Sequence, residues 1–388
     1  MGEVYASYNN IISSYGFDSE TAVQNISHEV SGLRCIDDQK FLPEPFYASL
    51  IDHERLQSEF EALNPKERFT RLEKMMLVSL EKVIKASRLT LTDRVGLIIS
   101  TTKGNIDVLG KDSSFQKERA YLGEMAKAIQ DFFGFTAEPI VLSNACVSGI
   151  LAVAVAKRFI VQERFDHVFI VSGDLVTKFI LSGFNSFQAL SNIPCRPYCK
   201  TRSGINIGEV AASILVTKDS RNLAKESVVV LGEASCNDAN HISGPSRTGE
   251  GLFKSVQSAL KQANLEADKI DYISAHGTAT SFNDEMEAIA FDRLGMRHIP
   301  LNSLKGYFGH TLGASGLLET IVGMHSLHQN TLFATKGFQE LGVSKPLNII
   351  EETISKKLYT FLKTASGFGG CNTAVIFAKS KLSRGKLA

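Results

Sequence analysis

The 388-residue chain lacks any long hydrophobic run and any marked excess of charge of one sign. Its longest apolar stretch, near residues 150–156, is far too short for a helix that crosses a membrane. A formal net charge of +1 gives no reason to expect nucleic acid or a membrane surface as the main partner. The first ten residues also lack the basic-then-apolar pattern of a secretory signal. We therefore expect a cytoplasmic protein without membrane insertion or nucleic-acid binding.

The six cysteines are scattered without the spacing of a disulfide framework, which favours a reducing compartment. Cys195 and Cys199 are separated by three residues, and no second pair lies near them. This spacing does not match the usual ligand pairs of zinc, so we expect no metal site. Hydrophobic residues make up 44% of the chain and charged residues 21%, which is typical of a globular protein.

Strands and helices alternate along much of the chain, as they do in layered α/β proteins. An expected helix at residues 249–263 followed by a strand at 272–274 repeats the helix-then-strand order of residues 148–172. No Pro-, Gly- or Ser-rich linker separates these segments. The pattern predicts two halves of similar topology, residues 1–225 and 226–388, within one compact body.

A strand-to-helix junction places Cys146 between the apolar residues 140–142 and a helix that begins near Ser148. This helix is so rich in small apolar residues that it must be buried on nearly all sides. The unpaired N–H groups and the positive end of such a helix favour a thiolate over a thiol. A buried structural cysteine is the competing interpretation, and the local pattern leaves both open.

Two histidines lie in segments rich in small residues farther along the chain. His276 follows the expected strand at 272–274, and the Gly, Ala and Thr residues around it leave room for a ligand. A structural histidine is the alternative interpretation at this position. Lys305 and His310 lie in a glycine-punctuated loop before an expected helix at 313–329. Here the alternative is a capped helix start with a solvated lysine.

A Gly-Phe-Gly-Gly segment lies close to the carboxyl end of the chain and contains Phe368. Its glycines allow the backbone to approach a ligand closely, while the aromatic ring forms a wall or gate. A phosphate cradle is the competing interpretation, but no Gly-Lys-Ser/Thr completes a P-loop. Each of these segments is a weak signal alone, and their occurrence in this order is a strong one.

Together these segments resemble a β-ketoacyl-acyl carrier protein synthase of the elongating, Cys-His-His branch of the thiolase superfamily. The resemblance covers nearly the whole chain and rests on Ala-Cys-Val-Ser-Gly, Ala-His-Gly-Thr-Ala-Thr, Lys-x-x-x-x-His-x-x-Gly-Ala-x-Gly and Gly-Phe-Gly-Gly. It implies an α/β fold of the thiolase type, with five αβαβα layers built from two duplicated halves. It also implies a homodimer, with a heterodimer as the alternative, and no metal or organic cofactor.

The resemblance implies a catalytic role for five residues. Cys146 would carry the acyl group as a thioester, because a thiolate is both a strong nucleophile and a good leaving group. His276 and His310 would stabilise the enolate that forms when CO₂ leaves a malonyl group. Lys305 would orient His310 and keep it neutral, and Glu287 would pair with that lysine.

The resemblance also implies the surroundings of the reacting groups. The backbone N–H groups of Cys146 and Phe368 would hold the acyl oxyanion, and Phe368 would act as a gate. Thr278 and Thr280 fit the malonyl pocket. Three further residues fall where relatives line the acyl pocket: Phe184, Ile106 and Leu109.

A basic segment near residue 66 corresponds to the region where, as the resemblance implies, relatives present a basic patch to the acidic acyl carrier protein. Lys66, Arg68 and Arg71 would form this patch on a helix expected at 68–85. Because Glu67 and Glu73 dilute the positive charge, a solvated helix face of mixed charge is an equally open interpretation.

Four features depart from the family pattern. Lys103 and Asp107 replace apolar residues near the acyl pocket, and Cys199 stands where relatives commonly have an aspartate that forms a salt bridge. Residues 1–14 are more polar than the opening strand of the family. These departures leave the acyl chain and the pathway open between housekeeping fatty-acid elongation and a specialised pigment or polyene pathway.

The expected function is the condensation of an acyl thioester on Cys146 with malonyl-acyl carrier protein, in fatty-acid, polyketide or polyene elongation. A non-catalytic partner subunit, similar to a chain-length factor, is the main alternative, although such partners usually lose the active cysteine. A biosynthetic thiolase is a second alternative. Thiolases have a Cys-His-Gly setting near the carboxyl end, whereas no histidine precedes Cys371 here.

Overall fold

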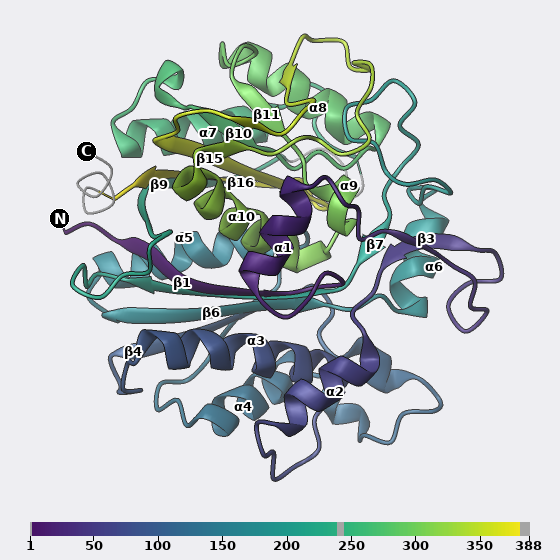
Figure 1. The fold of residues 1–388 in the computed structure, drawn as a ribbon, viewed down its shortest axis with the longest axis vertical. Coiled ribbons are helices and arrows are strands. Elements are labelled where there is room, and N and C mark those ends of the chain that lie inside the picture. The colour runs from purple at the N-terminus through teal and green to yellow at the C-terminus, as the bar shows by residue number, and fades with distance from the viewer. Residues whose placement is uncertain (1, 239–243, 381–388) are drawn as a thin grey trace.

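The computed structural model describes residues 2–238 and 244–380 and has five alternating layers of helices and sheet (Figure 1). Eleven strands form one continuous sheet in the order β13-β11-β10-β15-β16-β9-β1-β8-β6-β4-β5. Their bounds are β1 Tyr5–Ile12, β4 Val95–Ser100, β5 Ile140–Leu142, β6 His167–Asp174, β8 Val210–Thr217, β9 Val228–Asn237, β10 Tyr272–Ser274, β11 Pro300–Asn302, β13 Asn348–Ile349, β15 Thr360–Gly367 and β16 Cys371–Lys379.

The strands in one half of this sheet correspond in order and in direction to the strands in the other half. In the first half, β4 is parallel to β5 and β6, while β8 is antiparallel to β6 and β1. In the second half, β10 is parallel to β11 and β15, while β16 is antiparallel to β15 and β9. A short pairing of β1 with β9 joins the halves. The predicted duplication is confirmed, and the division between residues 225 and 226 stays a prediction.

Helices cover both outer faces of the sheet and fill the space between its two halves (Figure 1). One outer layer packs on the first half, and the other packs on the second half. The largest apolar core surrounds the two inner helices, α5 and α10. The bounds are α2 His53–Glu61, α3 Arg71–Ser87 and α4 Leu122–Phe133 in the first outer layer; α7 Glu250–Ala263 and α8 Ser281–Arg293 in the second; and α5 Ser148–Val161 and α10 Ser315–Gln329 inside.

Shorter elements complete the chain. A small sheet contains three strands, and a separate pair contains two. Their bounds, with those of the remaining helices, are β2 Arg34–Ile36, β3 Phe46–Ser49, β7 Ile207–Gly208, β12 Thr331–Leu332, β14 Ile354–Ser355, α1 Ser19–Ser27, α6 Lys178–Ser186 and α9 Lys305–Phe308. Among the described residues, no helix combines the length and the apolar character that a membrane span requires.

One departure from the family pattern leaves the fold intact, and one expected helix boundary is wrong. The polar amino-terminal segment does form a strand, β1, and this strand lies at the centre of the sheet. Its buried polar side chains are satisfied, for example by a 2.8 Å hydrogen bond between Ser7 Oγ and Ser227 Oγ. The helix expected from residue 68 begins only at Arg71, because Thr70 and Glu73 form a capping box there.

Glycines allow the two inner helices to approach each other closely. A Cβ atom on Gly149 of α5 would lie 2.7 Å from the backbone O of Gly313 and the backbone N of Leu317. A Cβ atom on Gly316 would lie 2.6 Å from the backbone N of Ile150. Real Cβ atoms do not approach backbone atoms so closely, so larger residues would separate the helices. This contact places the start of α5 beside the loop that precedes α10.

Candidate active site

Cys146 lies on a tight turn between β5 and α5. Ala145 has φ = 45°, which is in the left-handed region that residues with a side chain rarely adopt. Ser148 fixes the turn through its hydroxyl, which accepts from the backbone N of Asn144 at 2.8 Å and donates to the carbonyl of Ala145 at 2.7 Å. Cys146 therefore faces a cavity from the end of a sheet strand, as the sequence predicts.

Burial of the Cys146 thiol opposes the activation that we expect from the helix end. Burial raises the pKa of Cys146 to about 12, and nearby Cys371 adds to the effect, while Lys305 acts in the opposite direction. Removal of a thiolate from water costs free energy, and the positive end of α5 offsets part of this cost. Burial therefore favours the thiol form of the resting side chain.

His276 follows β10 and is held through its backbone. Its N–H donates to Glu287 Oε1 at 2.9 Å, and its carbonyl accepts from the Lys305 ammonium. Lys305 Nζ also lies 3.4 Å from His276 Nδ1. Because an ammonium group only donates, Nδ1 is the acceptor, and the proton of the neutral ring is on Nε2.

His310 precedes α10 and is oriented by the turn that follows it. The backbone N–H of Leu312 donates to His310 Nδ1 at 3.0 Å, and Ser315 Oγ lies 3.2 Å from the same atom. The proton of the neutral ring is therefore also on Nε2. Burial, followed by the charge of Lys305, lowers the pKa of both His276 and His310 well below the ordinary value. Both imidazoles are neutral N–H donors.

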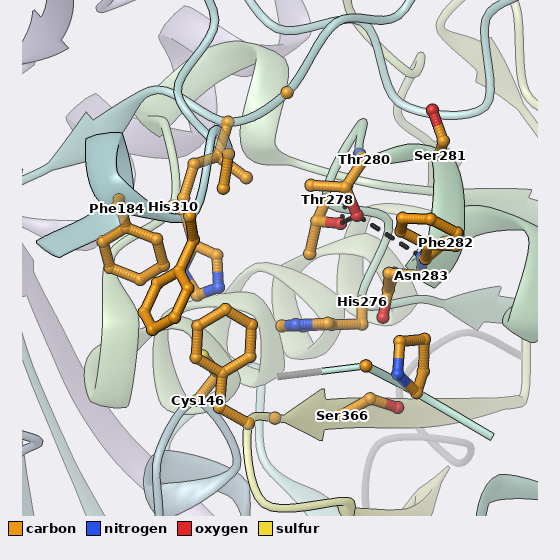
Figure 2. A pocket seen from close by; sticks show the side chains of 18 of the residues that line it. Cys146, Phe184, His276, Thr278, Thr280, Ser281, Phe282, Asn283, His310 and Ser366 are labelled. Atoms are coloured by element: carbon orange, nitrogen blue, oxygen red, sulfur yellow. Dashed lines mark hydrogen bonds between the residues drawn. The ribbon is translucent and has the colours of Figure 1, made fainter. Parts of the chain in front are cut away.

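The structure brings the predicted cysteine and both predicted histidines together (Figure 2). The Cys146 sulfur and one nitrogen from each of His276 and His310 all lie within 4.8 Å of one another. The three side chains come from segments that are 34 to 164 residues apart in the sequence. An atom placed among them would contact a nucleophile and two hydrogen-bond donors.

The predicted roles of Lys305 and Glu287 require correction. Lys305 contacts His276 rather than His310, and its ion pair is with Glu319 Oε1 at 2.8 Å rather than with Glu287. The Glu287 carboxylate instead accepts from the backbone N–H groups of His276 and Gly277. Glu287 thus shapes the loop that carries His276, because α8 presents it to two adjacent amides.

A cavity of about 330 Å³ opens in front of these three side chains. Thr278 and Thr280 line one side, and their hydroxyl oxygens are 2.8 Å apart (Figure 2). Phe184 and Phe368 line the other, with ring centroids 5.8 Å apart. The Phe187 ring also packs edge-on against Phe368, at 5.4 Å. Phe368 is 39% exposed, so it lies at the entrance.

Two further sets of predicted residues lie away from this cavity. Ile106 and Leu109 do not line it in the single chain, and the Leu109 side chain is exposed. Their expected place in an acyl pocket that extends across a dimer interface stays a prediction. Lys66 and Arg68 precede α3 and are exposed, whereas Arg71 is bound to Glu209 Oε2 at 2.7 Å. Arg71 therefore does not contribute a free charge to a surface patch.

The departures from the family pattern fall in different environments. Lys103 and Asp107 are exposed in the single chain. Cys199 is buried beside Thr201, with Sγ 3.4 Å from Oγ1. Burial tends to raise the pKa of Cys199, but hydrogen bonds from Thr201 and nearby backbone amides outweigh it and lower the pKa to about 7.

The charges around the Cys146, His276 and His310 cluster indicate what it can bind. Among the described residues, Cys146, His276 and His310 form the group of possible ligands whose atoms are close enough together to hold a metal ion. However, the charges that act on both imidazoles are the ammonium groups of Lys305 and Lys363, which lie behind the rings. Positive charge repels a metal cation and stabilises an anion. The cluster is therefore better suited to a developing oxyanion than to a metal.

Comparison with known proteins identifies the family. A model of the beta-ketoacyl synthase N-terminal domain matches residues 13–222, and a model of the beta-ketoacyl synthase C-terminal domain matches residues 227–339. The chain belongs to the beta-ketoacyl synthase family. The predicted resemblance is therefore confirmed, and with it the thiolase-like fold class.

Individual relatives agree with this assignment. The chain is 31% identical over 252 residues to 3-oxoacyl-[acyl-carrier-protein] synthase 2 of Rhizobium meliloti, covering 61% of this chain and 59% of that one. It is 27% identical to the tetracenomycin polyketide synthase ketoacyl synthase alpha subunit of Streptomyces glaucescens, covering 84% and 85%. Several matches, including the Rhizobium one, span only 59 to 64% of the relative's length.

Solved structures share the fold. A ketosynthase from Xenorhabdus doucetiae, determined in complex with its chain length factor, superimposes with a TM-score of 0.86. The two sequences are 23% identical, and the match covers 98% of each chain. A beta-ketoacyl synthase from Burkholderia phymatum gives a TM-score of 0.88 at 21% identity, covering 98% of this chain and 100% of that one.

Sequence reasoning missed two charged residues that support the site, Glu319 and Lys363. Each is the lone charged residue in an otherwise apolar or weakly polar buried segment, α10 and β15 respectively. A fully buried lysine or glutamate is rare unless it is paired. Two such isolated charges of opposite sign in one chain were therefore a signal that they pair.

Proposed function

We propose that this chain catalyses the decarboxylative condensation of an acyl thioester on Cys146 with malonyl-acyl carrier protein. The products are β-ketoacyl-acyl carrier protein and CO₂. The observation that carries this proposal is the convergence of the Cys146 sulfur with one nitrogen of His276 and one of His310 within 4.8 Å. A nucleophile beside two neutral N–H donors matches the two successive steps that this reaction requires.

In the first step, the sulfur of Cys146 attacks the acyl carbonyl of a carrier-protein thioester. The new C–S bond forms, the C–S bond to the carrier protein breaks, and the proton of the Cys146 thiol passes to the departing thiolate. The backbone N–H groups of Cys146 and Phe368 would hold the oxyanion. Gly367 supports this role, because a Cβ atom there would lie only 3.1 Å from the Cys146 backbone N.

In the second step, the malonyl C–C bond breaks, CO₂ leaves, and the electron pair forms an enolate. His276 and His310 would donate from Nε2 to the enolate oxygen. The enolate carbon then attacks the acyl carbonyl on Cys146, and the thiolate that leaves takes a proton from solvent. Thr278 and Thr280 lie close to His276 and would bind the malonyl group.

The partner of this reaction would be an acyl carrier protein, held by the exposed Lys66 and Arg68. We further propose a dimer, either with a second copy or with a related subunit. The sheet edge at β5 supports this proposal, since Ile140, Val141 and Leu142 are all half-exposed apolar residues on a terminal strand. A cytoplasmic location stays a prediction.

The experiment that tests this function supplies the purified chain with acyl-carrier protein and malonyl-carrier protein. We expect an acyl adduct on Cys146 by mass spectrometry, followed by β-ketoacyl-carrier protein and CO₂. Cys146→Ala should abolish condensation and retain some decarboxylation. The control is Cys236→Ala, which alters a half-exposed cysteine and should leave condensation unchanged. No acyl adduct on Cys146 would contradict the proposal and favour a non-catalytic partner subunit.

A further inference from the structure

Lys363 is a buried cation for which the proposed mechanism has no role. It lies in β15, where its register partner is Ser274 at the end of β10. Its side chain is completely buried. A lysine in such an environment must be held by strong partners, because removal of an ammonium group from water costs several kcal/mol.

All three donor positions of the Lys363 ammonium have partners close to His276. Lys363 Nζ lies 3.0 Å from the carbonyl of Ser274 and 3.2 Å from that of Ala275. These two residues directly precede His276 in the sequence. The third partner is Glu319 Oε2, which forms an ion pair with Nζ at 2.6 Å.

Glu319 connects Lys363 to the residue that contacts His276. Its other carboxylate oxygen, Oε1, pairs with Lys305 Nζ at 2.8 Å. One buried carboxylate thus lies between two buried ammonium groups, and Lys305 in turn contacts His276 Nδ1. The triad has one more positive charge than negative charge, and this excess faces the two imidazoles.

We propose that Lys363 is a positioning residue of this site: its buried positive charge holds Glu319 and Lys305 in place and adds to the burial and the Lys305 charge that keep both histidines neutral. The proposal rests on the proposed function, because a neutral imidazole stabilises an enolate without protonating it. A positively charged imidazolium at the same position is a much stronger acid. It would protonate the enolate carbon and release an acetyl thioester in place of the condensation product.

Burial reduces the negative charge of the carboxyl groups around the site, because it raises the pKa of Glu287, Asp284 and Asp174. The titratable groups beside the histidines, beside their loops or beside Cys146 are Lys305 on α9, Glu319 on α10, Glu287 and Asp284 on α8, Asp174 on β6, Cys371 on β16, and Lys103. Glu287 and Asp284 direct their oxygens to backbone N–H groups, including those of Gly277 and Thr278. Asp174 accepts from Thr101, Thr102 and Gly313. In agreement, Lys363 is among the groups that lower the pKa of both His276 and His310.

The test compares the whole chain with Lys363→Met, which keeps the length of the side chain and removes its charge. Histidine-selective ¹³C NMR gives the titration of His276 and His310, assigned with His276→Gln and His310→Gln. We expect the pKa of at least one of these histidines to rise by about one unit in Lys363→Met. Lys157→Met, which removes a half-buried lysine of α5 that contacts Leu231 O and Gln262, should leave both titrations unchanged.

Lys363→Arg separates charge from packing. Because Lys363→Arg keeps the positive charge, we expect the histidine pKa values to stay as low as in wild type. If Lys363 had a purely structural role, the larger arginine side chain would disturb the site, and the histidine titrations, at least as much as methionine does. Lys363→Gln, which can still donate to Ser274 O, replaces Lys363→Met if the latter does not fold. Unchanged histidine titrations in the folded uncharged variants would overturn the proposal.

A second measurement connects the charge to the reaction. With acyl- and malonyl-carrier protein, the ratio of acetyl- to β-ketoacyl-carrier protein should rise several-fold in Lys363→Met at the acidic end of the pH range, starting at a higher pH than in wild type. Wild type and Lys157→Met should change little. An equal ratio in all three proteins would overturn the role in the reaction. The NMR titration does not depend on turnover, so failure of the proposed function and failure of this inference are distinguishable.

Discussion

The imidazole rings of His276 and His310 meet edge to face, with centroids 5.2 Å apart and planes at 84°. Different elements deliver them, because His276 follows β10 and His310 precedes α10. In each ring, Nδ1 accepts a hydrogen bond from the protein, so Nε2–H remains for a ligand. The pair therefore forms a two-donor site for one oxyanion beside the Cys146 sulfur.

Removal of either histidine tests this two-donor site. His276→Ala or His310→Ala should lower the rate of malonyl decarboxylation roughly a hundredfold, because each removes one donor to the enolate oxygen. The rate of CO₂ release from malonyl-carrier protein measures the effect. His298→Ala, which alters an exposed histidine outside the cavity, is the control. Full decarboxylation in either site variant would remove the role assigned to that histidine.

The reactivity of Cys146 should depend on pH in the manner of a buried thiol. Because burial raises its pKa to about 12, only a small fraction is thiolate near neutrality. We expect the rate of Cys146 alkylation by iodoacetamide, followed by peptide mass spectrometry, to keep rising throughout the alkaline range. A free thiol in the same tube levels off above about pH 9. A Cys146 rate that levels off below about pH 8 would instead indicate a resting thiolate.

The exposed pair of Lys66 and Arg68 should govern binding of the carrier protein. Charge reversal by Lys66→Glu with Arg68→Glu should raise KM for acyl-carrier protein and leave kcat nearly unchanged, because steering charges act on encounter rather than on chemistry. The effect should shrink as salt increases. Lys254→Glu with Lys261→Glu, on α7 in the opposite outer layer, provides a control of equal charge. Equal KM values for the two double variants would exclude the patch.

The close contact between α5 and α10 should be sensitive to one methyl group. Gly149→Ala would place a Cβ atom 2.7 Å from backbone atoms of Gly313 and Leu317, which cannot rotate away. We expect a loss of about 1–3 kcal/mol in the free energy of unfolding, measured by urea denaturation, together with lower condensation activity. Gly123→Ala in α4 meets no atom within 4 Å and should be neutral or stabilising. Equal stabilities of the two variants would contradict this account of the helix contact.

The local sequence determined the identity and the setting of the reacting groups. The strand-to-helix junction at Cys146, the strand end before His276 and the glycine-rich loop at His310 follow from patterns that span only a few residues. Strand ends, caps and close backbone approaches are decided by neighbours in the chain, so such patterns record them. The same kind of reasoning placed β5 and β10 with the bounds that the structure gives.

Only the tertiary structure decided which charges pair and how deeply the groups are buried. The sequence analysis paired Lys305 with Glu287, whereas the packing of α10 against the sheet brings Glu319 to Lys305. The same packing buried Lys363 against Glu319, and the burial of Cys146 raised the pKa of its thiol. Coulomb energy and desolvation depend on everything within several ångströms in space. Residues near each other in the sequence supply only part of that environment, so these properties follow from the fold alone.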